Sequence, residues 1–160
     1  LPNESPASFV VRMAVEKADA GYSKIAGNEI YVVAGDTIVV CDGKVFGKPA
    51  NQFEAKKTLQ ALSGKTHTVI SAVALMHDGA TYSTKCVTKV SFKKLTQQEI
   101  ENYTLSGESE GKAGAYAIQG KAATFISKIE GSYSSVMGLP LFELNELLEK
   151  SGYYREKENA

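Results

Sequence analysis

The sequence predicts an α/β fold in which helices flank a mixed, twisted β-sheet. Three observations predict it: apolar residues at helical spacing near the N-terminus, two long β-rich runs in the middle, and a leucine-rich helical stripe near the C-terminus. The chain has 160 residues, which suits one domain with a single sizeable core. We therefore expect residues 1–160 to form a single domain.

The first helix is expected to begin at the N-cap and first-turn pair Ser5 and Pro6 and to end near Ala20. Lys17 lies where the apolar face of this helix would continue, so we expect its ammonium group to point toward the sheet or to emerge at its margin. The residues that form the apolar face are Phe9, Val10, Met13 and Ala14.

Two β-rich runs, residues 30–33 and 37–41, are separated by Gly35 and Asp36. The pattern predicts a strand that ends just before Asp36. The second run is expected to turn back through residues 42–46 as a hairpin, because an Asp-Gly pair follows it.

The middle of the chain predicts a helix followed by a long hairpin. Asn51 and Glu54 have capping-box spacing, and the helix that they open is expected to stop at residues 63–64. The runs 66–76 and 81–92 are then long enough to form a β-hairpin at the heart of a sheet.

The last third of the chain predicts two more helices and a strand. Thr96 and Glu99 repeat the capping-box spacing and open a short helix. Residues 111–123 are rich in glycine and alanine, so they either bring the backbone close to a ligand or simply connect packed elements. Residues 125–129 predict a strand, and Pro140 begins the final helix.

Composition argues against several classes of function. Basic and acidic residues both number 18, so no net charge draws the protein to nucleic acid or to an anionic membrane, and a nucleic-acid-binding function ranks low. Cys41 and Cys86 lack metal or redox spacing and are expected to be reduced core residues. No apolar run approaches the roughly 18 residues of a membrane span, and the first residues do not resemble a signal peptide, so we expect a cytoplasmic protein.

Four residues are candidates for chemistry, each with an ordinary alternative. Asp36 is expected at the carboxyl end of a strand, where α/β sheets form ligand clefts, although an Asp after Gly is more often a turn residue. Lys48 lies on a short Gly-Lys-Pro loop and could meet a phosphate, or be a surface lysine. Gln119 could read the edge of a pyrimidine, or be a loop amide, and Lys17 could simply extend its ammonium group to solvent.

The common nucleotide and hydrolase motifs are absent from the sequence. It contains no Walker A loop, dinucleotide-binding glycine motif, zinc-protease helix or serine-hydrolase elbow. His67 and His77 lack the spacing of metal ligands and are expected to be structural or exposed. The residue patterns alone therefore indicate a soluble α/β domain with a possible anion site.

Several segments together resemble, in order and spacing, the motifs of the Maf family. The resemblance covers nearly the whole chain, and its motifs are highly specific as a set. The matching segments are Val-Glu-Lys-Ala at 15–18, Gly-Asp-Thr-Ile-Val-Val at 35–40, Gly-Lys-Pro at 47–49, Leu-Ser-Gly-Lys-Thr-His at 62–67, Lys-Ala-Gly-Ala-Tyr-Ala-Ile-Gln-Gly at 112–120, Ile-Glu-Gly-Ser-Tyr at 129–133 and Val-Met-Gly-Leu-Pro-Leu at 136–141.

The resemblance implies a fold similar to that of inosine-triphosphate pyrophosphatases and hydrolysis of nucleoside triphosphates to the monophosphate and pyrophosphate. Asp36 matches the family's catalytic aspartate, which acts as the base for the attacking water and as a ligand of a divalent metal. Lys17 and Lys48 match its phosphate-side lysines. The implied cofactor is Mg²⁺ or Mn²⁺, which needs few protein ligands when it binds together with substrate phosphates.

Two residues indicate the branch of the family. Gln119 and Thr37 match specificity positions of the branch that hydrolyses dTTP and UTP, and an amide with a hydroxyl suits the imide edge of thymine or uracil. Modified pyrimidine nucleotides are further candidate substrates. The resemblance also implies a homodimer, and the alternative function is a non-catalytic, nucleotide-binding regulator of septum formation.

The chain departs from the family pattern at three places. The family's opening Ser-containing loop with Pro-Arg-Arg has no counterpart, so we expect that N-terminal segment to be missing from these 160 residues. Gly111 stands where the family usually carries Asp, which is expected to affect placement of metal or water. Gly35 stands where Ala is usual, and we expect this to be a tolerated packing change.

Overall fold

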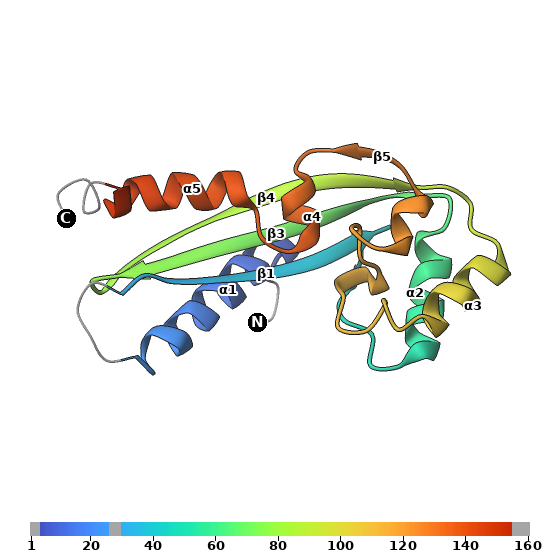
Figure 1. The fold of residues 1–160 in the computed structure, drawn as a ribbon, viewed down its shortest axis with the longest axis horizontal. Coiled ribbons are helices and arrows are strands. Elements are labelled where there is room, and N and C mark those ends of the chain that lie inside the picture. The colour runs from blue at the N-terminus through green and yellow to red at the C-terminus, as the bar shows by residue number, and fades with distance from the viewer. Residues whose placement is uncertain (1–3, 26–29, 155–160) are drawn as a thin grey trace.

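The computed structural model describes residues 4–25 and 30–154 as one α/β unit with an elongated outline (Figure 1). The helices are α1 (Pro6–Tyr22), α2 (Gln52–Leu62), α3 (Gln97–Leu105), α4 (Tyr133–Met137) and α5 (Leu141–Lys150). The strands are β1 (Val32–Cys41), β2 (Lys44–Phe46), β3 (Thr66–His77), β4 (Ala80–Phe92) and β5 (Ile126–Glu130). Two short 3-10 helices, η1 (Ala113–Ala115) and η2 (Lys121–Phe125), lie in the connection between α3 and β5.

The expected α/β fold with helices flanking a sheet is confirmed, but the strand pairing differs from the mixed sheet predicted. Within the described residues the strand order is β2-β1-β3-β4-β5, and every neighbouring pair is antiparallel. Two tight hairpins join β1 to β2 and β3 to β4, and such short connections reverse the chain direction. The segment containing α2 then returns the chain to the other side of β1, where β3 also runs antiparallel to it.

The prediction that a strand ends just before Asp36 is wrong. Gly35 and Asp36 lie inside β1, where they pair with Val73 and Ala72 of β3. Gly35 does not have a positive φ, so it continues the extended backbone instead of forming a turn. Asp36 is therefore a mid-strand residue.

The two faces of the sheet are covered by different helices. Helix α1 covers one face, where Val10, Ala14 and Ala18 are fully buried against residues such as Ile38. The opposite face is covered by the remaining helices, and Val39, the neighbour of Ile38, packs there in the core shared with α2 and α3. The alternation of side chains along a strand produces this division.

Local capping explains where the helices begin. The Ser5 side chain accepts a hydrogen bond from the backbone N–H of Ser8 and caps α1, as predicted. Thr96 and Glu99 form a complete capping box at α3. At α2 only half of the predicted box is present, because the Glu54 carboxylate accepts from the N–H of Ala50.

No helix in the described part of the chain is long and apolar enough to cross a membrane. The cysteine prediction is only partly confirmed. Cys41 is buried in the core, whereas Cys86 is half-buried on β4, and both are free thiols. Burial raises the pKa of the Cys41 thiol.

Candidate active site

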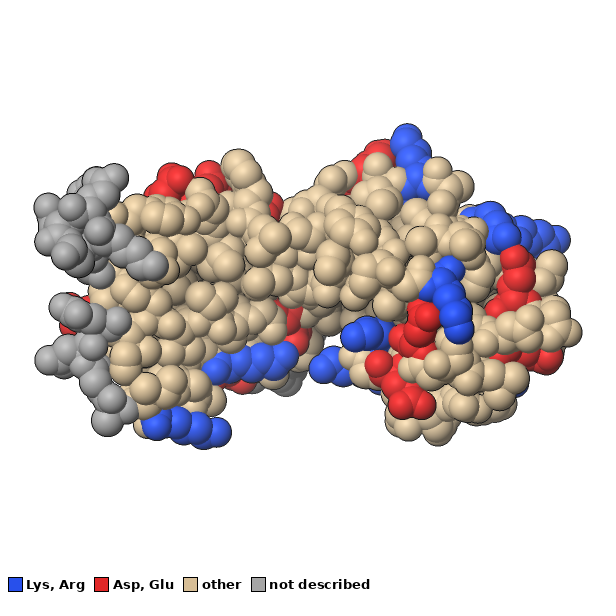
Figure 2. Space-filling view, viewed as in Figure 1, with Lys and Arg blue, Asp and Glu red and all other residues tan. Residues whose placement is uncertain are grey.

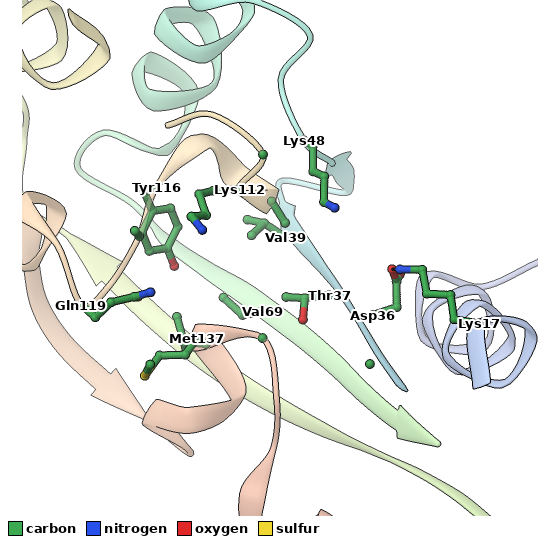
Figure 3. A pocket seen from close by; sticks show the side chains of 16 residues that line it. Lys17, Asp36, Thr37, Val39, Lys48, Val69, Lys112, Tyr116, Gln119 and Met137 are labelled. Atoms are coloured by element: carbon green, nitrogen blue, oxygen red, sulfur yellow. Dashed lines mark hydrogen bonds and ion pairs between the residues drawn. The ribbon is translucent and has the colours of Figure 1, made fainter. Parts of the chain in front are cut away.

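All five residues singled out from the sequence line one cleft beside β1 (Figure 3). The cleft has a volume of about 210 Å³ and is partly open to solvent. Lys17, Asp36, Thr37, Lys48 and Gln119 come from four places in the chain that span about a hundred residues. The fold therefore brings together what the sequence separates.

The cleft lies across a free edge of the sheet. In the described structure β2 pairs only with residues 39–41 of β1, so residues 32–38 have a strand partner on one side only. Asp36 projects toward α1, and Thr37, the next residue, projects to the opposite face. Because the edge between them is open, both side chains line the same cleft.

Asp36 forms an ion pair with Lys17 at one end of the cleft. The Lys17 Nζ donates to Asp36 Oδ1 at 2.5 Å, and the aspartate side chain is 16% exposed while the lysine is 44% exposed. Lys17 is thus at the margin of the sheet, as expected. The pair holds the carboxylate in one orientation with its second oxygen available to a ligand.

Two more lysines line the cleft, Lys48 on the loop before α2 and Lys112 just before η1 (Figure 3). Among the described residues neither has an ion-pair or hydrogen-bond partner. The molecular surface is notched between α1 and the lobe of α2 and α3, and basic side chains lie on both sides of the notch (Figure 2). The cleft is thus lined by three lysines and one carboxylate, a charge balance that favours a polyanionic ligand.

The loop that contains Lys112 and Gln119 is held in place by three hydrogen bonds. The Gly114 N–H donates to Gly47 O at 3.1 Å, which ties this loop to that of Lys48. The Ala117 N–H donates to the Tyr103 hydroxyl at 3.0 Å. Tyr116 Oη lies 2.9 Å from Nε2 of the buried His67.

His67 is a structural residue of this support, as the sequence suggested. Its side chain is 1% exposed and lies edge-on to the rings of Phe92 and Tyr116. Burial lowers the pKa of His67 to about 4, so the ring is neutral at pH 7. Burial likewise raises the pKa of Tyr116, so its hydroxyl stays protonated.

Gln119 lies at the end of the cleft away from Lys17, and Thr37 lies between Asp36 and Gln119 (Figure 3). The Thr37 hydroxyl is 2.8 Å from Ser71 Oγ, and Ser71 Oγ donates to the backbone carbonyl of Ser135 in α4 at 2.6 Å. The Gln119 side chain is exposed and has no hydrogen-bond partner among the described residues. The Thr37 hydroxyl is therefore held by hydrogen bonds, whereas the Gln119 amide is free to rotate.

Sequence reasoning missed several residues of the cleft. Lys112 and Tyr116 lie inside the matching segment 112–120, but only Gln119 of that segment was given a role, and nothing in its spacing marked the other two side chains. Residues 136–138 close the cleft from the short helix α4, whose five residues are too few for helical periodicity to show. The signal available was the matching segment 136–141, which begins with these three residues but was given no role in the site.

The donor set of the cleft fits a divalent metal that binds together with a substrate. Asp36 is the one carboxylate among the lining residues, and Gly111 supplies no second one. The described residues contain no cluster of three His, Cys, Asp or Glu side chains that could hold a metal alone. Mg²⁺ is commonly held by one or two carboxylates, substrate phosphates and water, so a single aspartate facing a polyanion site suffices.

Comparison with known proteins agrees with this geometry. Residues 1–151 match the family model described as Maf-like protein. A protein named dTTP/UTP pyrophosphatase from Hydrogenovibrio crunogenus is 55% identical over 156 residues, which cover 98% of this chain and 81% of that protein. Proteins of the same name from Nitrosomonas europaea and Bordetella avium are each 48% identical, over 95% and 94% of this chain and 75% and 77% of theirs. The chain belongs to the Maf family.

Proposed function

We propose that this protein is a nucleoside triphosphate pyrophosphatase that hydrolyses dTTP and UTP to the monophosphate and pyrophosphate. The observation that carries the proposal is the polarity of the cleft. One end has Asp36 with Lys17 and Lys48, the other has the amide of Gln119, and the hydroxyl of Thr37 lies between them. A pyrimidine nucleoside triphosphate has the matching polarity, with its polyanion at one end and its hydrogen-bonding base at the other. Relatives that carry this activity in their names support the same substrate.

The reaction needs a water aligned with a phosphoanhydride bond and compensation of phosphate charge. Asp36 accepts a proton from the water while the water oxygen forms the new bond to phosphorus. The bond between that phosphorus and the oxygen of the leaving pyrophosphate breaks. Lys17 keeps the Asp36 carboxylate oriented, because the two are paired at 2.5 Å. Lys48 and Lys112 provide positive charge for the phosphate oxygens.

A divalent metal, Mg²⁺ or Mn²⁺, completes this proposal as the cofactor. Asp36 would hold it jointly with the phosphate oxygens of the substrate. When bound, such a metal neutralises the charge that develops on the leaving pyrophosphate. The homodimer and the cytoplasmic location expected from the sequence stay predictions.

The direct test is pyrophosphate release by the Asp36→Asn variant. We expect a loss of about a thousandfold in kcat for dTTP and UTP, because the amide cannot accept the proton of the attacking water. Asp42→Asn is the matched control. Asp42 also pairs with a lysine, Lys65 at 2.8 Å, but its side chain is 68% exposed and does not line the cleft.

Two outcomes would contradict the proposal. Equal activity of Asp36→Asn and Asp42→Asn would show that Asp36 does not act as the base in the reaction. If the wild-type protein binds UTP but releases no pyrophosphate with Mg²⁺ or Mn²⁺, and Asp36→Asn binds equally well, the non-catalytic nucleotide-binding regulator is favoured instead.

A further inference from the structure

The hydrogen bonds around Thr37 form a short chain whose direction can be deduced. The carbonyl oxygen of Ser135 can only accept, so the Ser71 hydroxyl, 2.6 Å away, must donate to it. A serine hydroxyl has one proton, and this bond uses it. In the 2.8 Å contact between Thr37 Oγ1 and Ser71 Oγ, the donor must therefore be Thr37.

The fold keeps this chain of hydrogen bonds in place. Thr37 and Ser71 are direct partners in the register of β1 and β3, and Ser71 is fully buried. The carbonyl of Ser135 also accepts from the N–H of Gly138 at 3.0 Å, so its position is fixed by the end of α4. Solvent therefore cannot easily replace Ser71 as the acceptor for Thr37.

Because the Thr37 hydroxyl donates its proton to Ser71, it can act toward a ligand only as a hydrogen-bond acceptor. Gly138 leaves room beside it, because a Cβ at Gly138 would be in van der Waals contact with Thr37 Oγ1, at 3.8 Å, and the glycine has none. In contrast, Gln119 has no protein partner in the described structure, and its amide can rotate to present either a donor or an acceptor. A rotatable amide pairs with uracil and cytosine alike, so it cannot discriminate between them by itself.

We infer that Ser71 is a positioning residue that fixes the Thr37 hydroxyl as a hydrogen-bond acceptor, so that the cleft selects pyrimidines that carry a proton on N3. This inference rests on the proposed function and deepens it. Uracil and thymine have an N3–H that can donate to Thr37, whereas N3 of cytosine is itself an acceptor. Two acceptors facing each other leave both unpaired, which disfavours CTP.

The same geometry defines the class of accepted substrates. Selection acts at N3, so a substituent on C5 does not change the pairing with Thr37. Pyrimidine nucleotides modified at C5 are accepted as long as N3 stays protonated, and bases methylated at N3 are rejected.

The test compares kcat/KM for UTP and CTP in wild-type protein and in Ser71→Ala. Without the Ser71 oxygen, the Thr37 hydroxyl is free to rotate and donate to N3 of cytosine. We expect the ratio of UTP to CTP activity to fall by about tenfold, the value of one hydrogen bond. A purely structural role for Ser71 would lower both activities together and leave the ratio unchanged.

A matched control is available in the same sheet. Thr66 Oγ1 and Ser91 Oγ also lie 2.8 Å apart as register partners of β3 and β4, but they are remote from the cleft. Ser91→Ala removes an equivalent hydroxyl pair and should leave the ratio unchanged. Equal changes in Ser71→Ala and Ser91→Ala would overturn the inference.

Variants of Thr37 keep the inference testable if Ser71→Ala does not fold. Thr37→Ser retains the hydroxyl and should keep the preference for UTP, whereas Thr37→Val removes it and should reduce the ratio. Adding Ser71→Ala to Thr37→Val should change the ratio no further. An unchanged ratio in Thr37→Val would overturn the inference.

Failure of the proposed function can be distinguished from failure of this inference. UTP and CTP analogues with an imido group between the α- and β-phosphates report selectivity by calorimetry without turnover. If wild-type protein releases no pyrophosphate but binds the UTP analogue more tightly, and Ser71→Ala reduces that preference, the inference stands while the reaction is wrong. If the protein releases pyrophosphate but Ser71→Ala leaves the ratio of UTP to CTP activity unchanged, the proposed reaction stands and the inference is wrong.

Discussion

Asp36 and Thr37 show how one residue step in a strand separates two tasks. Alternation along β1 sends Asp36 to the face of α1 and Thr37 to the face of α4, yet both reach one cleft because the strand edge between them is open. The sequence could identify both residues by motif. It could not show that they lie on opposite faces, because the prediction that the strand ended at Gly35 concealed the alternation across it.

Lys48 tests the electrostatics of the phosphate end. In Lys48→Ala we expect KM for UTP to rise and kcat/KM to fall by about tenfold to a hundredfold, since a charged hydrogen bond to phosphate contributes about 1.5 to 3 kcal/mol. Steady-state kinetics at low and high salt measures this, and the difference from wild type should shrink as salt screens the charge.

Lys44→Ala is the control for Lys48. Lys44 is an exposed lysine of β2, only a few residues away in the chain, and it does not line the cleft. If Lys44→Ala reduces kcat/KM as much as Lys48→Ala does, the effect comes from net charge and not from a phosphate contact.

At the scale of elements, the loop around η1 is the part of the site that the sequence described least well. Its composition predicted close approach of backbone to a ligand, and several of its residues do line the cleft. Composition could not show that Gly114 and Ala115 both have positive φ, which turns the chain so that Lys112 and Tyr116 line the same cleft. That conformation depends on distant partners, Gly47 and His67, which local patterns do not reveal.

Two glycines of this loop separate backbone strain from steric fit. Gly114 has φ +70°, and a Cβ there would lie 2.7 Å from Val39 Cγ2. Gly111 has nearly the same φ, +66°, but a Cβ there would meet nothing within 4 Å. We expect Gly111→Ala to lower the free energy of unfolding by about 1 kcal/mol, from left-handed strain alone. Gly114→Ala should cost about 2 to 4 kcal/mol, because Val39 or the loop must also move.

Urea unfolding of both variants at pH 7 measures this difference. Displacement of η1 also moves Lys112 and Tyr116. The rate of UTP hydrolysis by Gly114→Ala should therefore fall in proportion to the fraction of molecules in which this loop is displaced. Equal unfolding free energies for the two variants would show that the clash with Val39 is relieved without cost.

For the whole molecule, the sequence predicted most elements because their signals are local. Serine and threonine caps, an apolar stripe on α1 and the long β-rich runs of β3 and β4 each act over a few residues. Strand order and direction were not predictable in the same way. They depend on which sheet edge each segment joins, and the antiparallel return of β3 beside β1 is decided by packing of α2 and α3 against the shared core.

The buried His67 makes the stability of the whole molecule depend on pH. Its pKa is about 4 in the folded protein, against an ordinary value of 6.5. Between these values the unfolded chain binds a proton that the folded protein does not, so the free energy of unfolding falls as pH decreases from about 6.5 toward 4. The full loss from this group is on the order of 3 kcal/mol.

Other groups with lowered pKa values affect stability only at lower pH, so they do not interfere with the effect of His67 between about pH 4.5 and 6.5. The carboxyls of Glu4 and Glu99 have pKa values of about 2, because Arg12 and Lys93 donate hydrogen bonds to them, so their stabilisation is lost only as pH falls below about 4.5. Urea unfolding at intervals from pH 7 to pH 4.5 should therefore show the slope of His67. The slope should disappear in His67→Phe, which keeps an aromatic ring beside Phe92 and Tyr116 but cannot titrate; loss of the hydrogen bond to Tyr116 lowers the stability of this variant at every pH and leaves the slope unaffected. If His67→Phe keeps the wild-type slope, another group must gain the proton on unfolding, and the neutral buried imidazole is not what limits stability in acid.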